Sequence, residues 1–292
     1  MPFKSGFVTI IGRPNAGKST LLNAFLGEKI SIVTEKPQTT RNTVRGVKNL
    51  PDCQIVFVDT PGMHSGKGLL NRFMLAEARS SLDNVDAVLY LIEPVTPVSE
   101  GDLFIIEGLK TVKSPVVLCI NKVDRVGKDS LLPLIKDLSG RFPFKDIVPV
   151  SALTGEGVDL LLDLVRGLLA PGPKYFPDDI ITDQPERFIA SEIIREKVYL
   201  FTSQEIPYSA AVVVESFKEK RGLISIGAVI NVERDSQKGI IIGKGGAMLK
   251  KIGTSARRDI ERLLAAKVFL KLFVKVRKDW TKKPGALKEF GY

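Results

Sequence analysis

The 292-residue sequence predicts an α/β domain with a mostly parallel sheet and helices on both faces, followed by a smaller α+β domain. Three observations predict this architecture. Strand-length apolar runs alternate with helical segments in the first part of the chain, a proline-rich stretch ends that alternation, and a predicted hairpin, helix and strand come after it. At ~100–200 residues per domain, the chain is long enough for about two domains.

The first domain contains five apolar runs of strand length, at residues 7–11, 55–58, 87–92, 116–120 and 147–150. Helical spacing of apolar residues occurs between them, at residues 21–26, 72–82 and 159–169. Buried strands that alternate with helices indicate a parallel sheet covered on both faces. Ligands bind such sheets at the carboxyl ends of the strands.

The alternation stops at PGPKYFPDD, residues 171–179, whose three prolines cannot continue a helix. We therefore predict a first domain over residues 1–171, a linker over 172–184 and a second domain over 185–292. In the second domain we expect a helix over 185–202, a hairpin of strands 209–217 and 223–232 joined by KEKR, a helix to about residue 265, and a strand over 267–276. The tail carries Trp280, which either packs on this domain or stacks on a nucleic-acid base.

Positive charge is concentrated in the second domain. Residues 1–171 hold 20 Lys and Arg against 18 Asp and Glu, whereas residues 172–292 hold 23 against 15. A basic domain attracts polyanions such as nucleic acid or anionic lipid. A surface that is only soluble is an equally good explanation of charge alone.

The sequence contains no features of export or membrane insertion. No apolar run approaches the ~18 residues of a membrane span, and the first ten residues lack the apolar region of a signal peptide. Cys53 and Cys119 lie in or beside apolar stretches, which is the usual setting of buried free thiols in a reducing compartment. We expect a cytoplasmic protein.

The stretch GRPNAGKS, residues 12–19, fits G-x-x-x-x-G-K-[ST] in full, after a predicted strand and before a predicted helix. Glycines allow backbone N–H groups to point at phosphate oxygens. Lys18 places a positive charge near the β- and γ-phosphates, the Ser19 hydroxyl suits Mg²⁺, and the helix N-terminus favours the anion. The alternative, a glycine-rich turn without a ligand, is poorly supported by a complete match in this context.

Two further strands end in polar motifs. Asp59-Thr60-Pro61-Gly62 follows the run 55–58, and its carboxylate suits Mg²⁺ through water while the Gly62 N–H can turn toward a γ-phosphate. Asn121-Lys122-Val123-Asp124 follows the run 116–120. A carboxylate at Asp124 accepts two hydrogen bonds from guanine, a pair that adenine does not offer, so we expect guanine selectivity.

The remaining parts of the base site follow from these positions. Lys122 can lie along the base, Asn121 can brace the loops, and Ala152 of Ser151-Ala152-Leu153 can offer its N–H to the guanine oxygen. The tripeptide by itself is uninformative. Together, the motifs predict GTP contacts from Gly12, Arg13, Pro14, Asn15, Ala16, Gly17, Lys18, Ser19, Asp59, Thr60, Pro61, Gly62, Met63, Asn121, Lys122, Val123, Asp124, Ser151, Ala152 and Leu153.

These four motifs, in this order and at these strand ends, resemble those of the small GTPase superfamily over about the first 170 residues. The resemblance implies a switch segment at Gln38-Thr39-Thr40-Arg41-Asn42, in which a threonine hydroxyl completes the Mg²⁺ shell. Thr39 and Thr40 both remain candidates, and we assign Thr40. The expected metal ligands are therefore Ser19, Thr40 and Asp59, and the expected catalytic groups are Lys18, Thr40 and Gly62.

One departure from that superfamily affects the expected rate. The position after Gly62, where many members carry a water-orienting glutamine, is Met63, a thioether that cannot do this. His64 is the single histidine, and we interpret it as an exposed loop residue rather than a general base. Slow intrinsic hydrolysis follows. Asn15 resembles an asparagine that ligates K⁺ in one branch of the superfamily, although simple turn chemistry also accounts for it.

The second domain contains Gly243-Lys244-Gly245-Gly246 between two helical segments. A G-x-x-G loop with a basic residue lets a nucleic-acid backbone approach closely, and a tight turn is the alternative. With the preceding hairpin and the last strand, residues 200–280 resemble a type II KH domain. We expect RNA contacts from Gly243, Lys244, Gly245, Gly246, Lys250, Lys251 and Arg257.

A guanine-nucleotide domain followed by a C-terminal KH domain resembles the Era family of bacterial ribosome-assembly GTPases over nearly the whole chain. The resemblance implies a monomer that binds the 3′ end of 16S ribosomal RNA and the 30S subunit, acts in 16S rRNA maturation and small-subunit assembly, and contacts the inner membrane peripherally. Two alternatives are a membrane-associated signalling GTPase and an RNA chaperone in which hydrolysis is incidental.

Overall fold

A computed structural model describes residues 2–64, 66–203, 206–220 and 222–292. Its contacts define two compact units. Unit 1 comprises Met1–Ser31, Thr40–Gly66 and Arg72–Asp183, and unit 2 comprises Ile32–Thr39, Lys67–Asn71 and Gln184–Tyr292. Two short segments of the front half therefore pack with the basic back half, a grouping that no sequence pattern indicates.

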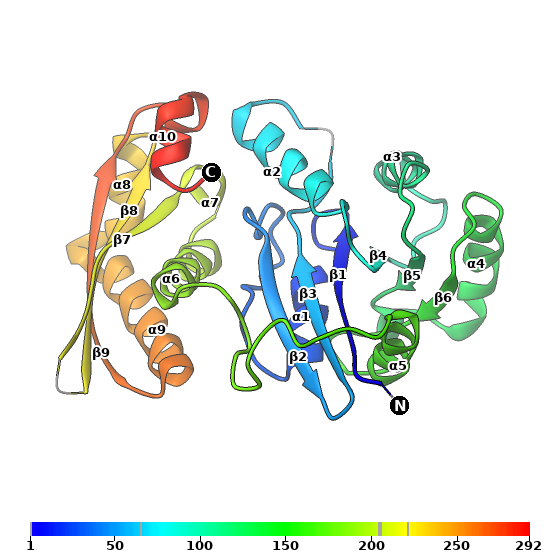
Figure 1. The fold of residues 1–292 in the computed structure, drawn as a ribbon. Coiled ribbons are helices and arrows are strands. Elements are labelled where there is room, and N and C mark those ends of the chain that lie inside the picture. The colour runs from blue at the N-terminus through cyan, green and yellow to red at the C-terminus, as the bar shows by residue number, and fades with distance from the viewer. Residues whose placement is uncertain (1, 65, 204–205, 221) are drawn as a thin grey trace. The chain divides into compact units, whose positions relative to one another are not determined.

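Unit 1 is built on a six-stranded sheet with the strand order β2-β3-β1-β4-β5-β6 (Figure 1). The strands are β1 (Lys4–Gly12), β2 (Val44–Leu50), β3 (Cys53–Asp59), β4 (Ala87–Ile92), β5 (Val116–Ile120) and β6 (Asp146–Pro149). Every residue of β3, β4 and β5 is buried, as expected for strands covered on both faces. The four pairings among β3, β1, β4, β5 and β6 are parallel, so their carboxyl ends lie at one edge of the sheet.

Helices cover both faces of this sheet, as predicted. They are α1 (Lys18–Leu26), α2 (Leu69–Ser80), α3 (Glu100–Leu109), α4 (Leu131–Ser139) and α5 (Val158–Leu168). Apolar residues of α2, α3 and α4 pack with Ile11 and alternate residues of β4 and β5 on one face. On the other face Phe25 of α1 stacks on Phe57 of β3 with ring centroids 4.4 Å apart.

The strand β2 was not predicted. Its sequence, VRGVKNL, interrupts apolar residues with Arg45, Gly46 and Lys48, so it has no continuous apolar run. It pairs antiparallel with β3 at the edge of the sheet, where one partner strand and one buried face are enough. Gly46 lets α1 pack closely on this strand, because a Cβ atom would lie 2.5 Å from the Leu26 Cδ1 atom and would displace that side chain.

The sheet of unit 2 has the strand order β7-β8-β9, with β7 and β8 antiparallel and β9 parallel to β8. Its elements are α6 (Glu186–Phe201), α7 (Ile206–Ser209), β7 (Ala211–Lys220), β8 (Leu223–Val232), α8 (Asp235–Ile242), α9 (Ala247–Leu264), β9 (Lys267–Val276) and α10 (Pro284–Glu289). The predicted hairpin-first, third-strand-last order is confirmed. The first hairpin strand begins at Ala211 and extends to Lys220, later than expected, and the predicted turn includes Arg221, which lies outside the described residues.

The core of unit 2 lies between its sheet and the helices α6 and α9. Ile189, Ile193, Ile194 and Val198 of α6 are buried in this core, which confirms the predicted packing face. Trp280 is buried as well and its indole N–H donates to the Ser209 carbonyl at 2.8 Å, so it packs rather than stacks on RNA. In the part of the chain that the structure describes, no helix is long and apolar enough to cross a membrane.

Candidate nucleotide site and nucleic-acid interface

The loop between β1 and α1 is restricted by its surroundings at both glycines of the motif. Gly12 and Gly17 have φ angles of 153° and 98°. A Cβ at Gly12 would lie 2.4 Å from the Leu91 carbonyl oxygen, and one at Gly17 would lie 2.1 Å from Asn121 Nδ2. Both the backbone conformation and the neighbouring atoms therefore require glycine.

Lys18 is buried directly behind this loop, with 5% of its surface exposed. Its ammonium donates to the carbonyls of Gly12 (3.2 Å) and Arg13 (3.0 Å). Burial lowers the pKa of Lys18 to about 8, and the charge of Asp59 opposes that shift. Burial likewise raises the pKa of Asp59, against Lys18 and three hydroxyl hydrogen bonds. Two poorly solvated opposite charges suit a site that binds an anion and a cation together.

Three hydroxyls converge on the Asp59 carboxylate. Asp59 Oδ2 accepts from Ser19 Oγ at 2.6 Å, from Ser31 Oγ at 2.7 Å and from Thr40 Oγ1 at 3.5 Å, and the Ser19 and Thr40 hydroxyls lie 2.8 Å apart. Asp59 Oδ1 is buried and has no hydrogen-bond partner among the described residues. An orphaned carboxylate oxygen beside hydroxyl groups is an oxygen-rich set that fits Mg²⁺.

The structure separates the two candidate threonines of the switch segment. Thr40 is the one whose hydroxyl reaches Ser19 and Asp59. The Thr39 hydroxyl donates to the Lys36 carbonyl at 2.7 Å and pairs with Thr34 at 2.6 Å. Ser31 was missed by sequence reasoning, because no motif marks it.

The loop after β3 approaches the loop after β1 through Gly62. A Cβ at Gly62 would lie 2.6 Å from the backbone nitrogen of Pro14, so this close approach requires glycine. The Met63 N–H donates to the Gly12 carbonyl at 3.0 Å, and the Thr60 hydroxyl donates to the Ile10 carbonyl at 2.8 Å. Asp59-Thr60-Pro61-Gly62 therefore lies against the first motif, as the shared strand-end edge predicts.

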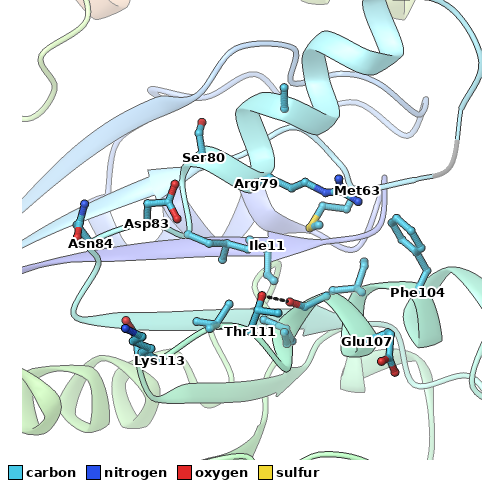
Figure 2. A pocket seen from close by; sticks show the side chains of 17 residues that line it. Ile11, Met63, Arg79, Ser80, Asp83, Asn84, Phe104, Glu107, Thr111 and Lys113 are labelled. Atoms are coloured by element: carbon cyan, nitrogen blue, oxygen red, sulfur yellow. Dashed lines mark hydrogen bonds between the residues drawn. The ribbon is translucent and has the colours of Figure 1, made fainter.

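Met63 points away from this polar cluster. Its side chain is buried in the apolar cluster that contains Ile11, Ala78 and Ile105. Figure 2 shows it with Ile11 in a cavity of about 1190 Å³ that lies between α2 and α3. His64 is half-buried, and its Nδ1 lies 3.0 Å from the Gly62 carbonyl oxygen. We predicted an exposed side chain for His64, and the structure shows a partly buried one.

The third and fourth motifs meet at Asn121. Its Nδ2 donates to the Ala16 carbonyl at 2.7 Å, and its Oδ1 accepts from the Ala152 N–H at 2.9 Å. Asn121 thus braces three loops, whereas the Ala152 N–H that we expected at a guanine oxygen is engaged by Asn121. Asp124 is exposed, and its Oδ1 accepts from the Ser151 hydroxyl at 2.6 Å.

The remaining predicted residues lie around these loops. Lys122 has a left-handed φ of 65° and pairs with Glu93 at 3.1 Å, and Arg13 pairs with Asp102 at 2.9 Å. Leu153 is 75% exposed, and the Val123 N–H donates to the Val150 carbonyl at 3.3 Å. In this structure Arg13 therefore interacts with a carboxylate of α3.

The G-x-x-G loop of unit 2 joins α8 to α9. Gly243, Gly245 and Gly246 have φ angles of 71°, 58° and 79°, all left-handed. A Cβ at Gly243 would lie 2.7 Å from the Met248 Cβ, whereas Gly245 and Gly246 have open space around their Cα atoms. Lys244 and Gly245 are exposed at the tip of the loop.

Exposed basic side chains follow this loop along α9. Lys250 and Arg257 are seven residues apart on α9, which places them on one face of the helix. Both are exposed, as is Lys251, whose ammonium lies 4.4 Å from the centroid of the Phe201 ring. A helix N-terminus beside the loop and these positive charges are features that favour phosphate groups.

The two units also match known families. A family model described as 50S ribosome-binding GTPase matches residues 7–122, and a KH domain model matches residues 205–281. GTPase Era of Geotalea daltonii is 58% identical over 99% of this chain and 98% of its own length, and GTPase Era of Geobacter metallireducens is 59% identical over 100% and 98%. The chain belongs to the Era GTPase family. It is a GTPase with a C-terminal KH domain.

Two solved structures of Era resemble the chain over its whole length. One is Aquifex aeolicus Era bound to GDP and AlF₄⁻, and the other is Era in complex with MgGDPNP and nucleotides 1506–1542 of 16S ribosomal RNA. Each is 41% identical, covers 99% of both chains and superimposes with a TM-score of 0.96. The predicted family and fold class are confirmed. The match to the GTPase model ends at Lys122, so Asp124 and Ser151 depend on their geometry.

Proposed function

We propose that this Era-family GTPase is a nucleotide-controlled RNA-binding protein that acts on the 3′ end of 16S ribosomal RNA during assembly of the small ribosomal subunit. The proposal is supported by the relative of known structure whose complex contains MgGDPNP and a 16S rRNA fragment. The observation that carries it is the set of hydrogen bonds between the switch segment preceding Thr40 and a helix of the KH-containing unit.

The nucleotide site acts through charges and donors that are already in place. Gly12, Gly17 and Lys18 offer N–H groups and an ammonium to the β- and γ-phosphates, and Asp124 selects guanine. Ser19, Thr40 and Asp59 would hold Mg²⁺, which when bound neutralises negative charge on the phosphates. Because Met63 is buried among apolar residues, no side chain at that position orients the attacking water, so we expect slow intrinsic hydrolysis.

A second cation is part of the proposal. Asn15 has a left-handed φ of 65° in the loop that wraps the phosphates. An amide oxygen at this place suits K⁺, whose charge would substitute for an arginine finger. Arg13 does not supply that charge in this structure, because its guanidinium pairs with Asp102.

Nucleotide control requires that Thr40 be linked to unit 2, and the segment that precedes it provides that link. Within unit 2, Ile32–Thr39 lies against α6. The Val33 N–H donates to Glu196 Oε1 at 3.0 Å, and the Arg195 guanidinium donates to the Thr39 carbonyl. Glu196 and Arg195 are both at most 1% exposed, so these hydrogen bonds are shielded from water.

The hydrogen bonds continue to the helix that follows the G-x-x-G loop. The Lys197 ammonium donates to Glu196 Oε2 at 2.7 Å and also pairs with Asp259 of α9. A change in the position of Thr40 on loss of the γ-phosphate would move Ile32–Thr39 and disturb this set of interactions. Because binding coupling is reciprocal, RNA would in turn alter nucleotide affinity.

The test measures affinity for a fluorescent RNA of the 16S 3′ end with the protein loaded with GDP or GDPNP. We expect at least about a fivefold difference, the lower end of usual coupling free energies. Thr40→Ala should abolish the difference, whereas Thr111→Ala, an exposed threonine on the surface of unit 1, should preserve it. Equal affinity in both states, with no effect of RNA on GTP turnover, would contradict nucleotide control.

The ribosomal target is tested separately. Sedimentation of the full chain with purified subunits should place it with the 30S subunit when GDPNP is present. The 50S subunit is the necessary control, because the matching GTPase family model is described by 50S binding. Co-sedimentation with 50S alone would reject the small-subunit assignment and leave RNA binding intact.

A further inference from the structure

The strand β9 carries a row of alternating lysine and phenylalanine residues on its outer face. The strand reads KVFLKLFVKV, and its odd-numbered residues are exposed. We call these residues the outer β9 row: Lys267, Phe269, Lys271, Phe273 and Lys275. The even-numbered residues point into the core of unit 2: Val268, Leu270, Leu272, Val274 and Val276.

The two phenylalanine rings of the row are unusually accessible for aromatic side chains. Phe269 is 57% exposed and Phe273 is 47% exposed. β9 is at the edge of the three-stranded sheet, so no described strand flanks it on its outer side. Burying either ring against a partner would therefore remove a large apolar area from water.

On the face of the sheet that carries the row, the neighbouring strand β8 presents small residues. In the parallel register, Ser225 is opposite Phe269 and Gly227 is opposite Lys271. The space beside Gly227 is taken by Ser216 of β7, whose Oγ would lie 2.6 Å from a Cβ at Gly227, so the small side chain of a serine covers this position. Small residues beside exposed rings give a shallow surface, in which a flat group can lie against a ring face.

The lysines of the row make only weak interactions inside the protein. The Lys271 ammonium lies 5.0 Å from the centroid of the Phe273 ring. Lys275 pairs with Glu215 at 2.9 Å, but both side chains are 55% exposed, and such pairs contribute little. Lys267 has no carboxylate within 4.0 Å among the described residues. The row therefore presents three ammonium groups, and Glu215 of β7 is the carboxylate paired with one of them.

We propose that the outer β9 row is a second surface for single-stranded RNA, in which bases stack on Phe269 and Phe273 and phosphates contact Lys267 and Lys271. Aromatic platforms combined with basic side chains are the general means of binding single strands without sequence preference. Successive lysines of the row are four residues apart, which is about 13 Å along a strand, and one phenylalanine lies midway between each pair. The alternation of lysine and phenylalanine suits RNA, a polymer in which each repeat contains a flat base and a negatively charged phosphate.

A membrane surface is less compatible with the same residues. Interfacial binding is favoured by a continuous apolar face, whereas here a charged side chain separates the two rings. A protein partner would have to cover all three lysines. The alternation therefore favours RNA, and lipid binding becomes an outcome of the test.

The row is distinct from the Gly243–Gly246 loop, because the inner face of the same sheet packs against α9. Ile252, Ala256 and Ile260 of α9 lie in the core beneath the sheet. An RNA that contacts both the loop and the row must therefore pass around the edge of the domain. This inference rests on the RNA-binding part of the proposed function and requires no nucleotide control.

The test compares fluorescent oligouridylates of about 8 and about 24 nucleotides, lengths near and above the usual site of a single module. Phe269→Ala/Phe273→Ala in the full chain should weaken binding of the longer RNA at least about tenfold, since stacking contributes substantially for each base. Binding of the shorter RNA and of GTP should stay unchanged. Phe269→Tyr/Phe273→Tyr should restore the affinity, because the ring faces remain.

Matched controls separate stacking from general effects. Leu200→Ala removes an apolar side chain that is 50% exposed on α6 of the same unit, and it should have no effect. Lys271→Gln should lower the affinity for the longer RNA and make that affinity less dependent on salt concentration. Lys288→Gln on α10 should change neither quantity. A 4-thiouridine version of the longer RNA should crosslink to peptides that contain Phe269 or Phe273.

Three results would overturn the proposal. The first is that the double alanine variant binds the longer RNA with unchanged affinity. The second is that neither phenylalanine is crosslinked. The third is that the double alanine variant loses binding to phosphatidylserine vesicles but still binds RNA. Failure of the nucleotide switch gives a different result, namely equal RNA affinity with GDP and GDPNP. All variants of the row are compared in one nucleotide state, so the two failures are distinguishable.

Discussion

The chain contains two glycine-rich loops, each with a lysine and each followed by a helix, and they are built in opposite ways. In unit 1, residues 12–19 lead from β1 into α1, and Lys18 is 5% exposed. In unit 2, Gly243–Gly246 lead from α8 into α9, and Lys244 is exposed. Each loop combines glycines with a positive charge, as a phosphate site requires, but only in the first loop is the lysine buried.

The surroundings of the glycines explain the difference. Protein atoms would contact a Cβ at Gly12 or Gly17, whereas the space beside Gly245 and Gly246 is open. The confined surroundings of the first loop suit one small ligand whose charge is desolvated on binding. The open space beside the second loop suits the proposed approach of a polymer backbone without a fixed register.

The largest expected effect comes from adding a methyl group at a glycine of the confined loop. Gly17→Ala places a Cβ 2.1 Å from Asn121 Nδ2 at a φ of 98°, so it disturbs the phosphate loop and the base loop together. We expect GTP affinity to fall about 1000-fold, or ~4 kcal/mol. Titration with a fluorescent GTP analogue measures it.

Gly245→Ala is the matched control in the second loop. Its φ of 58° is unfavourable for alanine, but no atom lies within 4 Å of the new Cβ. GTP affinity should therefore stay the same, and RNA affinity should fall only several-fold. If the two variants lost GTP binding equally, the contrast between a confined loop and an open one would be wrong. The Gly17→Ala variant should still bind RNA, and that result would show that its unit 2 is folded.

The sequence was sufficient to predict the parts of this contrast that depend on local patterns. β4, β5 and β9 have the predicted bounds, because β4 and β5 are continuous apolar runs and β9 alternates strictly between the two faces of its sheet. The motif at residues 12–19 also carries its own conformational requirement in its glycines. Both glycine loops were therefore placed correctly between their flanking elements.

Features that depend on tertiary contacts could not be predicted in this way. Ser31 donates to Asp59 across 28 positions, and no spacing rule connects them. Arg195 and Glu196 are charged residues on a helix with an apolar face, so periodicity predicts that they are solvated, yet both are buried. Their burial depends on the Ile32–Thr39 segment, which no pattern assigns to unit 2.

The next effect tests whether the confined site reads one base. Asp124 is exposed and bonded to Ser151, so its carboxylate can turn to a bound guanine. Asp124→Asn should lower the affinity for GTP about 100-fold, because the asparagine NH₂ group would face an N–H donor of guanine where the carboxylate had accepted its hydrogen bond. Xanthosine triphosphate, which has a carbonyl at that place, should gain affinity. Unchanged GTP affinity, measured by competition against a labelled analogue, would contradict the assignment of Asp124.

A charge change in the open loop should have a smaller effect on its own ligand. Lys244→Asp/Gly245→Asp puts two carboxylates where phosphates are expected, and RNA affinity should fall roughly 30-fold at moderate salt. GTP affinity and binding to phosphatidylserine vesicles should change little, since lipid attraction is spread over many lysines. Fluorescence anisotropy and vesicle sedimentation measure the two ligands.

Lys288→Asp/Gly285→Asp is the matched control for that variant. It makes the same change in net charge on α10, at an exposed lysine and at a glycine with open space around it. RNA affinity should fall only a few-fold through the long-range charge. If this control lowered RNA affinity as much as Lys244→Asp/Gly245→Asp does, net charge rather than the loop would determine RNA binding. Loss of vesicle binding with RNA binding retained would favour the membrane-associated alternative.

The smallest effect concerns Asn15, the one residue of the confined loop with a left-handed backbone and a side chain. Its φ of 65° is explained either by turn chemistry or by the use of its amide as a K⁺ ligand. Asn15→Gly separates these roles, because glycine adopts the same φ and lacks the amide. We expect GTP turnover of the unmodified chain to be roughly tenfold faster in KCl than in NaCl, and Asn15→Gly to remove that ratio while GDP affinity stays the same. If the glycine variant kept the ratio, the asparagine would serve only the turn, and equal rates in the two salts before any substitution would exclude K⁺ from the site.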